Sequence, residues 1–113
     1  MPEIIFLWSW RNEEHIGRHD VGRDEAEYVV IHARPPYPEA TGGEKWTVRG
    51  PTSEGRFLQT IFVRVLIEGV QADEFDRLDL HERVALQSGQ KAVRIIHARD
   101  LTPREKQRLR RRK

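Results

Sequence analysis

Residues 45–67, KWTVRGPTSEGRFLQTIFVRVLI, decide the fold of this chain. The second half of the stretch, residues 56–67, is apolar on both faces, which is typical of a central strand covered on both sides. Residues 45–50 predict a second strand, with Trp46 and Val48 pointing inward. Between the two strands, PTSEG supplies the proline, serine and glycine that favour a tight turn. The stretch therefore predicts a hairpin.

The segment before the hairpin predicts one strand and two helices. Residues 4–10 alternate in the way that favours a short strand entering the core. Residues 11–19 predict a short helix with Ser9 or Asn12 as its cap. Residues 24–33 predict a second helix, with acidic residues in its first turn and apolar residues at helical spacing. Pro35 and Pro36 end that helix, and a loop is predicted over residues 35–44.

The segment after the hairpin is less regular. Residues 69–91 leave two interpretations open, an amphipathic helix over 73–87 or a partly ordered excursion, because Asp76 and Asp79 interrupt the apolar pattern. Residues 92–99 predict a third long strand. The sequence TPRE at 102–105 predicts the start of a last helix with a capping box. The order predicts an α+β domain with a small, mainly antiparallel sheet of three to four strands, two N-terminal helices and one C-terminal helix.

The composition limits the class of protein. A length of 113 residues suits a single domain, since domains most often have about 100–150 residues. The chain has no cysteine, which excludes disulfides, thiolate zinc sites and a cysteine nucleophile. The first apolar run, residues 4–8, is too short for a membrane span and lacks the features of a signal peptide. We therefore expect a cytoplasmic protein with no membrane association.

The charge is unevenly distributed along the chain. Residues 104–113 carry seven basic residues against one acidic, a net charge of +6, whereas residues 1–103 carry a net charge of −4. A basic end on an acidic body can attract RNA, DNA or an acidic partner. The alternative is a solvated helix end whose cations complement the helix dipole.

Several motifs resemble the BrnT family of toxins from type II toxin–antitoxin systems. They are FLW at 6–8, HIGRHDVGRDEA at 15–26, VRG at 48–50, GRFL at 55–58 and VRIIHARDLTPRE at 93–105, in the order that the family has them. Three features differ from the family pattern. His97 replaces a serine or threonine, Asp20 replaces a glycine, and the segment 69–91 is longer than the usual hairpin there.

The resemblance implies a RelE-like fold and a ribonuclease activity that arrests translation. It also implies a ribbon–helix–helix antitoxin of the BrnA type, and operator DNA that is bound indirectly through this antitoxin. No cofactor or metal ion is expected. His15 and His19 have a spacing that can bind zinc, but only Asp20 is close enough in sequence to complete such a site.

Metal-independent RNA cleavage needs a base for the ribose 2′-hydroxyl, cations for the phosphorane charge and an acid for the leaving oxygen. Histidine suits proton transfer, and arginine binds phosphate oxygens in bidentate fashion. Candidates from the matching motifs are His19, Arg56, His97 and Arg99 as catalytic residues, and Arg49, Arg94 and Arg104 as substrate-binding residues. His19 is the first choice as acid or base and His97 the second, with Arg56 and Arg99 gripping the phosphate. Strand alternation predicts that Arg99 shares a face with His97 and that Arg94 lies on the opposite face.

Each candidate also has a purely structural alternative. The arginines can form surface or capping ion pairs, and His19 can bond the last carbonyl groups of its helix. For the whole chain, the alternatives are a non-enzymatic module that binds nucleic acid or an antitoxin, and an α+β domain with a basic tail of no specific function.

Overall fold

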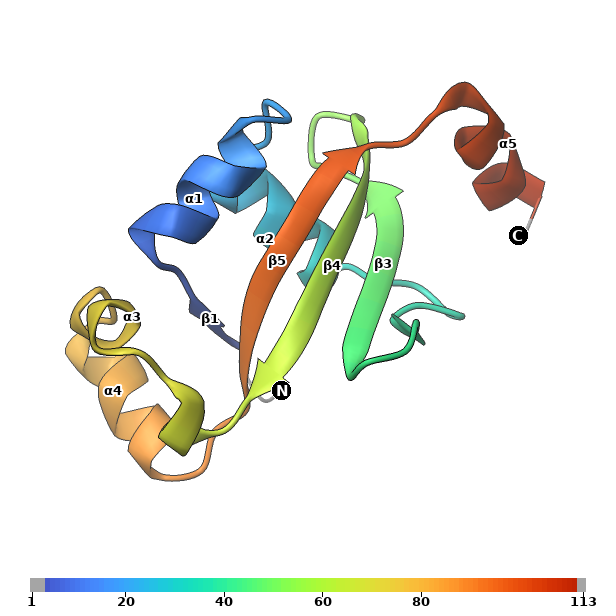
Figure 1. The fold of residues 1–113 in the computed structure, drawn as a ribbon. Coiled ribbons are helices and arrows are strands. Elements are labelled where there is room, and N and C mark those ends of the chain that lie inside the picture. The colour runs from blue at the N-terminus through green and yellow to red at the C-terminus, as the bar shows by residue number, and fades with distance from the viewer. Residues whose placement is uncertain (1–3, 112–113) are drawn as a thin grey trace.

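The computed structural model describes residues 4–111, which form one sheet flanked by helices (Figure 1). The elements are, in chain order, β1 (Ile5–Leu7), α1 (Trp10–Gly17), α2 (Arg23–Ile31), β2 (Glu39–Ala40), β3 (Lys45–Pro51), β4 (Phe57–Val65), the 3-10 turn η1 (Ile67–Gly69), α3 (Ala72–Asp76), α4 (Leu80–Gln87), β5 (Ala92–Asp100) and α5 (Pro103–Arg111). The predicted α+β class is confirmed. No helix in this part of the chain is long and apolar enough to cross a lipid bilayer.

The sheet has five strands in the order β1-β5-β4-β3-β2, so the prediction of three to four strands is wrong. β2 pairs with β3 inside the segment 35–44, which the sequence predicted as a loop. Its two residues are too few for an alternating pattern to reveal a strand. β1 pairs parallel with β5, and the other pairings are antiparallel. The sequence predicted β1 as a strand but not its parallel pairing. The prediction assumed hairpin connections, and these pair only strands that are neighbours in the chain.

One face of the sheet, the back face, packs against α2, which lies behind the strands in Figure 1. Its core contains Val48, Leu58, Phe62, Val93, Ile95 and Ala98 from the strands, and Ala26, Val29 and Val30 from α2. Trp8 is buried in this core and Trp46 packs against it, as predicted, while Trp10 is exposed. The apolar face of α2 therefore packs on the back face of the sheet, together with Ile16 of α1.

β5 contains a β-bulge at Ile96, because consecutive residues of β4 pair with Ile95 and with the residue that follows Ile96. The extra residue changes which side chains face the core, so Ile95 and Ala98, three positions apart, both lie in the back-face core. Arg94 and Arg99 consequently both point from the opposite, front face. The expectation that these two arginines lie on opposite faces is wrong, since simple alternation does not include a bulge.

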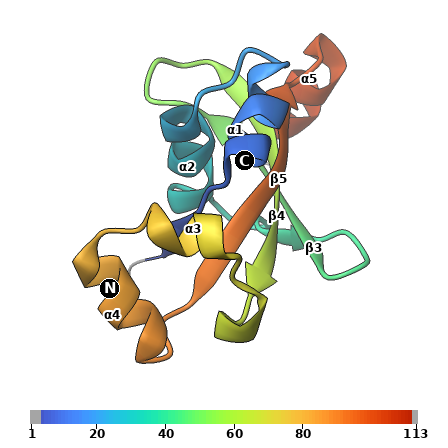
Figure 2. The same cartoon turned by 60° about the vertical axis from the view of Figure 1, so that its left-hand side comes forward.

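The front face is covered only at its β1 side. There α3 and α4 pack on the sheet, and the second apolar cluster contains Ile5, Leu7, Leu78, Leu86 and Ala92. Farther from β1, over β3, the start of β4 and the end of β5, no helix of the described chain packs across the front face, as Figures 1 and 2 show. The prediction that residues 56–67 are covered on both sides thus holds only for the end of β4 at Val65.

The segment 69–91 adopts neither of the two expected forms. It folds as η1 and two short helices, α3 and α4, which are separated by residues 77–79. The break has a local cause, because the Asp79 carboxylate accepts a hydrogen bond from the Glu82 backbone N–H at 2.7 Å and so caps α4. Asp79, which interrupts the apolar pattern in the sequence, therefore marks the start of a new helix, α4.

Other local predictions are confirmed. Ser9 caps α1, with its hydroxyl oxygen 3.1 Å from the Asn12 backbone nitrogen that donates to it. Thr102 and Glu105 form the predicted capping box at the start of α5. Asp20 ends the α1 region with a φ of 58°, in the left-handed region that favours glycine. The last basic residues of the predicted C-terminal helix, at 112–113, lie outside the described residues.

Candidate functional site

Three histidine rings gather beside the front face. His15 in α1 and His19 just after it are exposed, and His97 on β5 is partly buried. The centroid of the His97 ring lies 5.2 Å from that of His19 and 6.1 Å from that of His15. α1 packs along β5, and the spacing of four residues brings both α1-region rings to the same side (Figure 1). We call His15, His19 and His97 the histidine cluster.

His97 has the perturbed titration within the histidine cluster. Burial lowers the pKa of His97 below its ordinary value of 6.5, and the charges of His19, Arg99 and His15 lower it further. The imidazole of His97 is therefore neutral at neutral pH. A neutral imidazole beside cationic groups can accept a proton from a substrate hydroxyl.

A row of polar side chains crosses the front face next to the histidine cluster. Arg49 on β3, Gln59 on β4 and Arg99 on β5 are direct partners in the strand register. The Arg49 Nε donates to the Gln59 Oε1 at 2.9 Å, which fixes the guanidinium against the sheet. Arg99 is two residues from His97 on the same face. The row therefore lies beside the one titratable ring that has a depressed pKa.

Glu105 of α5 binds both arginines of this row. Its carboxylate accepts two hydrogen bonds from Arg99, at 2.8 and 2.9 Å, and a third from the Arg49 Nη2 at 3.1 Å. Hydrogen bonds from Arg99 and from the Thr102 backbone N–H are the main reasons that the pKa of Glu105 falls to about 2. Glu105 is thus ionised at any pH near neutrality, and the three groups together carry a net charge of +1.

Arg56 lies away from this row, at the turn between β3 and β4. Its guanidinium donates to both carboxylate oxygens of Asp100, at 2.7 and 3.0 Å, and to the Glu25 carboxylate at 3.1 Å. It also donates to the backbone oxygens of Asp20 at 2.6 Å and His19 at 3.3 Å. Arg56 therefore joins the turn between α1 and α2 to the end of β5, and its donors are already used in structural contacts.

Arg94 and Arg104 also lie apart from the histidine cluster. Arg94 donates to both carboxylate oxygens of Glu74 in α3, each at 2.6 Å, and Glu74 is completely buried. Arg104, in the first turn of α5, is exposed and has no ion pair within residues 4–111. The five candidate arginines considered from the sequence therefore do not form one cluster.

The structure brings His19 and His97 together, and it joins Arg49 to Arg99 through Glu105. Arg56 contacts the backbone oxygen of His19, but its guanidinium pairs with Asp100 and Glu25. Arg94 pairs with Glu74 in α3, and Arg104 is exposed on α5. Sequence reasoning missed Gln59 and the ion pairs of Glu105. Glu105 was recognised only as a helix-capping residue, and its second role depends on where α5 meets the sheet. The sequence analysis considered His15 only because its spacing to His19 can bind zinc. That spacing was the one feature of the sequence that could have indicated the histidine cluster.

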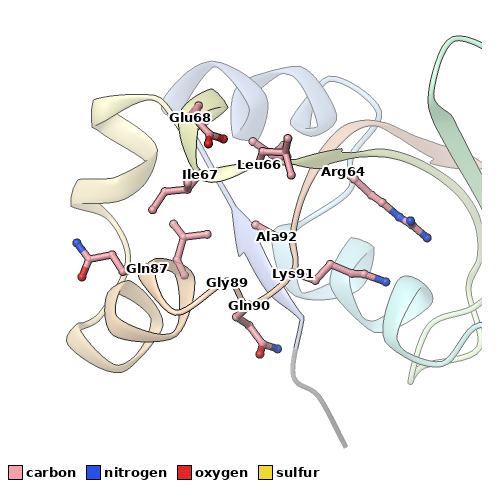
Figure 3. Close-up of a pocket in the computed structure, with 11 residues that line it drawn as sticks. Arg64, Leu66, Ile67, Glu68, Gln87, Gly89, Gln90, Lys91 and Ala92 are labelled. Atoms are coloured by element: carbon pink, nitrogen blue, oxygen red, sulfur yellow. The ribbon is translucent and has the colours of Figure 1, made fainter.

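The shape of the candidate site differs from that of a small-molecule pocket. A hollow of about 390 Å³ lies at the other end of the sheet, between the end of β4 and α4, and is lined by Leu66, Ile67, Gln87, Lys91 and other residues (Figure 3). It contains none of the predicted site residues. At the candidate site His15 and His19 are exposed, His97, Arg49 and Arg99 are partly buried, and Gln59 is buried.

Two further findings bear on what the chain can bind and to what it is related. Among residues 4–111, no group of three or more His, Asp or Glu side chains is arranged to hold a metal ion. No protein-family model matches the chain, and no curated protein matches its sequence.

Proposed function

We propose that the protein is a metal-independent endoribonuclease of the toxin type, with a RelE-like fold, that cleaves RNA on the front face of the sheet. The observation that carries the proposal is the position of His97. Its imidazole, neutral at neutral pH, lies beside the rings of His15 and His19 and two residues before Arg99, on the front face of the sheet.

The chemistry assigns a separate task to each group. His97 accepts the proton of a ribose 2′-hydroxyl, and the 2′-oxygen then attacks the adjacent phosphorus. His19 donates a proton to the leaving 5′-oxygen as the phosphorus–oxygen bond breaks. The products are a 2′,3′-cyclic phosphate and a 5′-hydroxyl, so no water, metal ion or cofactor is consumed.

The arginine row supplies the positive charge for this reaction. Negative charge accumulates on the non-bridging phosphate oxygens in the transition state, and a guanidinium stabilises it through two parallel hydrogen bonds. Arg99 is the nearest arginine to His97 along β5, and Arg49 lies across the sheet from it. In this proposal Arg56 and Arg94 are structural residues. Arg56 links the turn between α1 and α2 to the end of β5, and Arg94 pairs with the buried Glu74. Arg49 and Arg99 are also paired, but their carboxylate partner is Glu105 of α5, a helix with no buried residue in its described part.

The segments that resemble BrnT toxins are the ones that build this site. His19 belongs to the segment 15–26, Arg49 to 48–50, and His97 with Arg99 to 93–105. This coincidence supports a toxin role in the cytoplasm, with a ribbon–helix–helix antitoxin as partner and operator DNA reached through that antitoxin. Expression of the chain without a partner is expected to arrest growth.

The test is cleavage of a single-stranded RNA by the purified protein in the presence of a chelator. We expect 2′,3′-cyclic phosphate ends, no cleavage of the matching DNA, and a loss of about 100-fold or more in rate for His97→Gln and for Arg99→Gln. His32→Gln on α2 is the matched control and should retain full activity, because His32 lies outside the histidine cluster. Intact RNA with the wild-type protein, or full activity of His97→Gln, would contradict the proposal.

A second candidate is a module that binds nucleic acid without cleaving it. It is favoured by α5, whose Arg104, Arg108, Arg110 and Arg111 are exposed. Binding through such cations weakens steeply with salt. Salt-sensitive RNA binding without any cleavage by the wild-type protein would favour this second function.

A further inference from the structure

The contact between Glu105 and the arginine row has the chemistry of a phosphate contact. Arg99 uses two nitrogen atoms to bind the two carboxylate oxygens of Glu105 side by side, and Arg49 adds a hydrogen bond to one of them. The same guanidinium geometry binds phosphate oxygens in bidentate fashion. A carboxylate therefore occupies the place in which these two arginines would hold a substrate phosphate.

The helix that carries Glu105 is lightly attached to the rest of the chain. None of the described residues of α5 is buried, and its Leu109 is only partly buried against the core. Figure 1 shows α5 at the edge of the molecule, beyond the end of β5 and beside β3. Glu105 can thus leave the arginines through a movement of α5 that breaks few apolar contacts, chiefly the contact of Leu109 with the back-face core.

We propose that Arg49, Gln59 and Arg99 form an anion-binding site for a phosphate of single-stranded RNA, and that Glu105 occupies this site in the resting protein as an internal substitute. The inference rests on the proposed function, because it names the regulation of the same site. A phosphodiester can bind the arginines in bidentate fashion only after Glu105 withdraws. The resting protein is therefore self-inhibited, and any partner that moves α5 changes its affinity for RNA.

The size of the effect follows from the charges. With Glu105 in place the three charged groups sum to +1, and without its charge the two arginines present +2 to the phosphate. One unit charge a few ångströms away at the protein surface is expected to change the affinity by about tenfold or more.

The test uses Glu105→Gln, because glutamine keeps the capping box at this helix position while removing the charge. The probe is a 2′-O-methyl RNA oligonucleotide, which cannot be cleaved by attack of the 2′-oxygen, and its binding is followed by fluorescence anisotropy at fixed ionic strength. Glu54→Gln is the matched control, since it makes the same change of net charge in the exposed turn between β3 and β4.

We expect Glu105→Gln to bind the probe about tenfold more tightly than the wild type, and Glu54→Gln to differ from the wild type by less than about twofold. The double variant Arg99→Gln with Glu105→Gln should lose the gain. Equal or weaker binding by Glu105→Gln would overturn the inference, because Glu105 would then only orient the arginines for substrate.

A second variant keeps the inference testable if Glu105→Gln does not fold. Thr102→Ala removes the hydroxyl that caps α5, so it favours withdrawal of the helix while Glu105 keeps its charge. Loss of the cap in Thr102→Ala should weaken the docked helix enough to raise the affinity for the probe up to about fivefold. Affinity equal to that of the wild type would count against the inference. Because the probe is not cleaved, the outcome is independent of the nuclease proposal. A gain in binding without cleavage of ordinary RNA would refute the nuclease and leave the anion site standing.

Discussion

The ion pair between Arg94 and Glu74 gives the most direct test of which arginines are structural. Glu74 in α3 is completely buried and accepts two hydrogen bonds from Arg94 and one from the Gln71 backbone N–H at 3.0 Å. Burial raises the pKa of Glu74, but the hydrogen bonds from Arg94 and Gln71 outweigh it and hold the pKa below its ordinary value. Glu74 is therefore a buried carboxylate ion that depends on Arg94.

The substitution Arg94→Met should leave this carboxylate without its cation. Breaking a buried ion pair costs about 3–5 kcal/mol, and the lower end applies because solvent reaches part of Arg94. A single domain has a total unfolding free energy of about 5–15 kcal/mol, so a loss of about 3 kcal/mol is large. Replacing both partners, as in Arg94→Met with Glu74→Leu, should restore most of the stability, since no buried charge then remains.

The assay is urea denaturation followed by circular dichroism at pH 7 and pH 5. The deficit of Arg94→Met should be smaller at pH 5, because without Arg94 the pKa of Glu74 in the folded state rises above its ordinary value of 4.5 and the buried carboxylate takes up a proton. A loss of less than about 1 kcal/mol at pH 7 would refute the reasoning, given the expected cost of an unpaired buried charge. Arg94 would then be available for substrate, as the sequence had suggested.

Two further predictions concern Arg56 and His97. Arg56→Met should lower the unfolding free energy by about 2 kcal/mol, because charged hydrogen bonds are lost. The control is Arg18→Met, whose ion pair is exposed, and it should lower the unfolding free energy by less than about 0.5 kcal/mol in the same urea titration. Because the pKa of His97 lies below 6.5 in the folded state, stability should fall as the pH drops through 6.5, and His97→Gln should remove this part of the loss. In a plot of cleavage rate against pH, the fall in rate on the acidic side should also lie below pH 6.5. It should move to higher pH in Arg99→Gln, because the Arg99 charge lowers the pKa of His97. If it does not move, His97 is not the base whose titration controls the rate.

The fold was predictable where the sequence pattern is local. The hairpin of β3 and β4, the Ser9 cap and the capping box of Thr102 and Glu105 each depend on residues within a few positions of one another. The parallel pairing of β1 with β5 was not predictable in this way, because it joins residues about ninety positions apart and leaves no periodic signal. The same limit applies to α3 and α4, whose separation depends on a single cap at Asp79.

The candidate site was predictable in its residue types and only partly in its membership. Histidine and arginine were the groups sought for metal-independent chemistry, and the His15–His19 spacing anticipated that these two rings are neighbours. The partners that an arginine binds, however, come from distant parts of the chain and are fixed only by the tertiary fold. Arg56 and Arg99 look equivalent as sequence, and only the position of Glu25 and Asp100 on one side and Glu105 on the other separates them.

The bulge at Ile96 explains why the site is on the front face at all. If β5 continued the alternation of Val93 and Ile95, His97 would point into the back-face core and Ala98 would face the open surface. The unpaired Ile96 reverses this, so Ala98 is buried under α2 while His97 turns toward the rings of α1. A bulge re-aims the side chains that follow it, and in this strand it moves a histidine and an arginine together from the core side to an uncovered surface. The reversal serves packing as well, because it places the apolar Ala98 in the core where the polar imidazole of His97 would otherwise lie. The bulge therefore acts on both faces of β5 at once: it keeps the back-face core apolar and brings His97 and Arg99 to the face where the proposed chemistry lies.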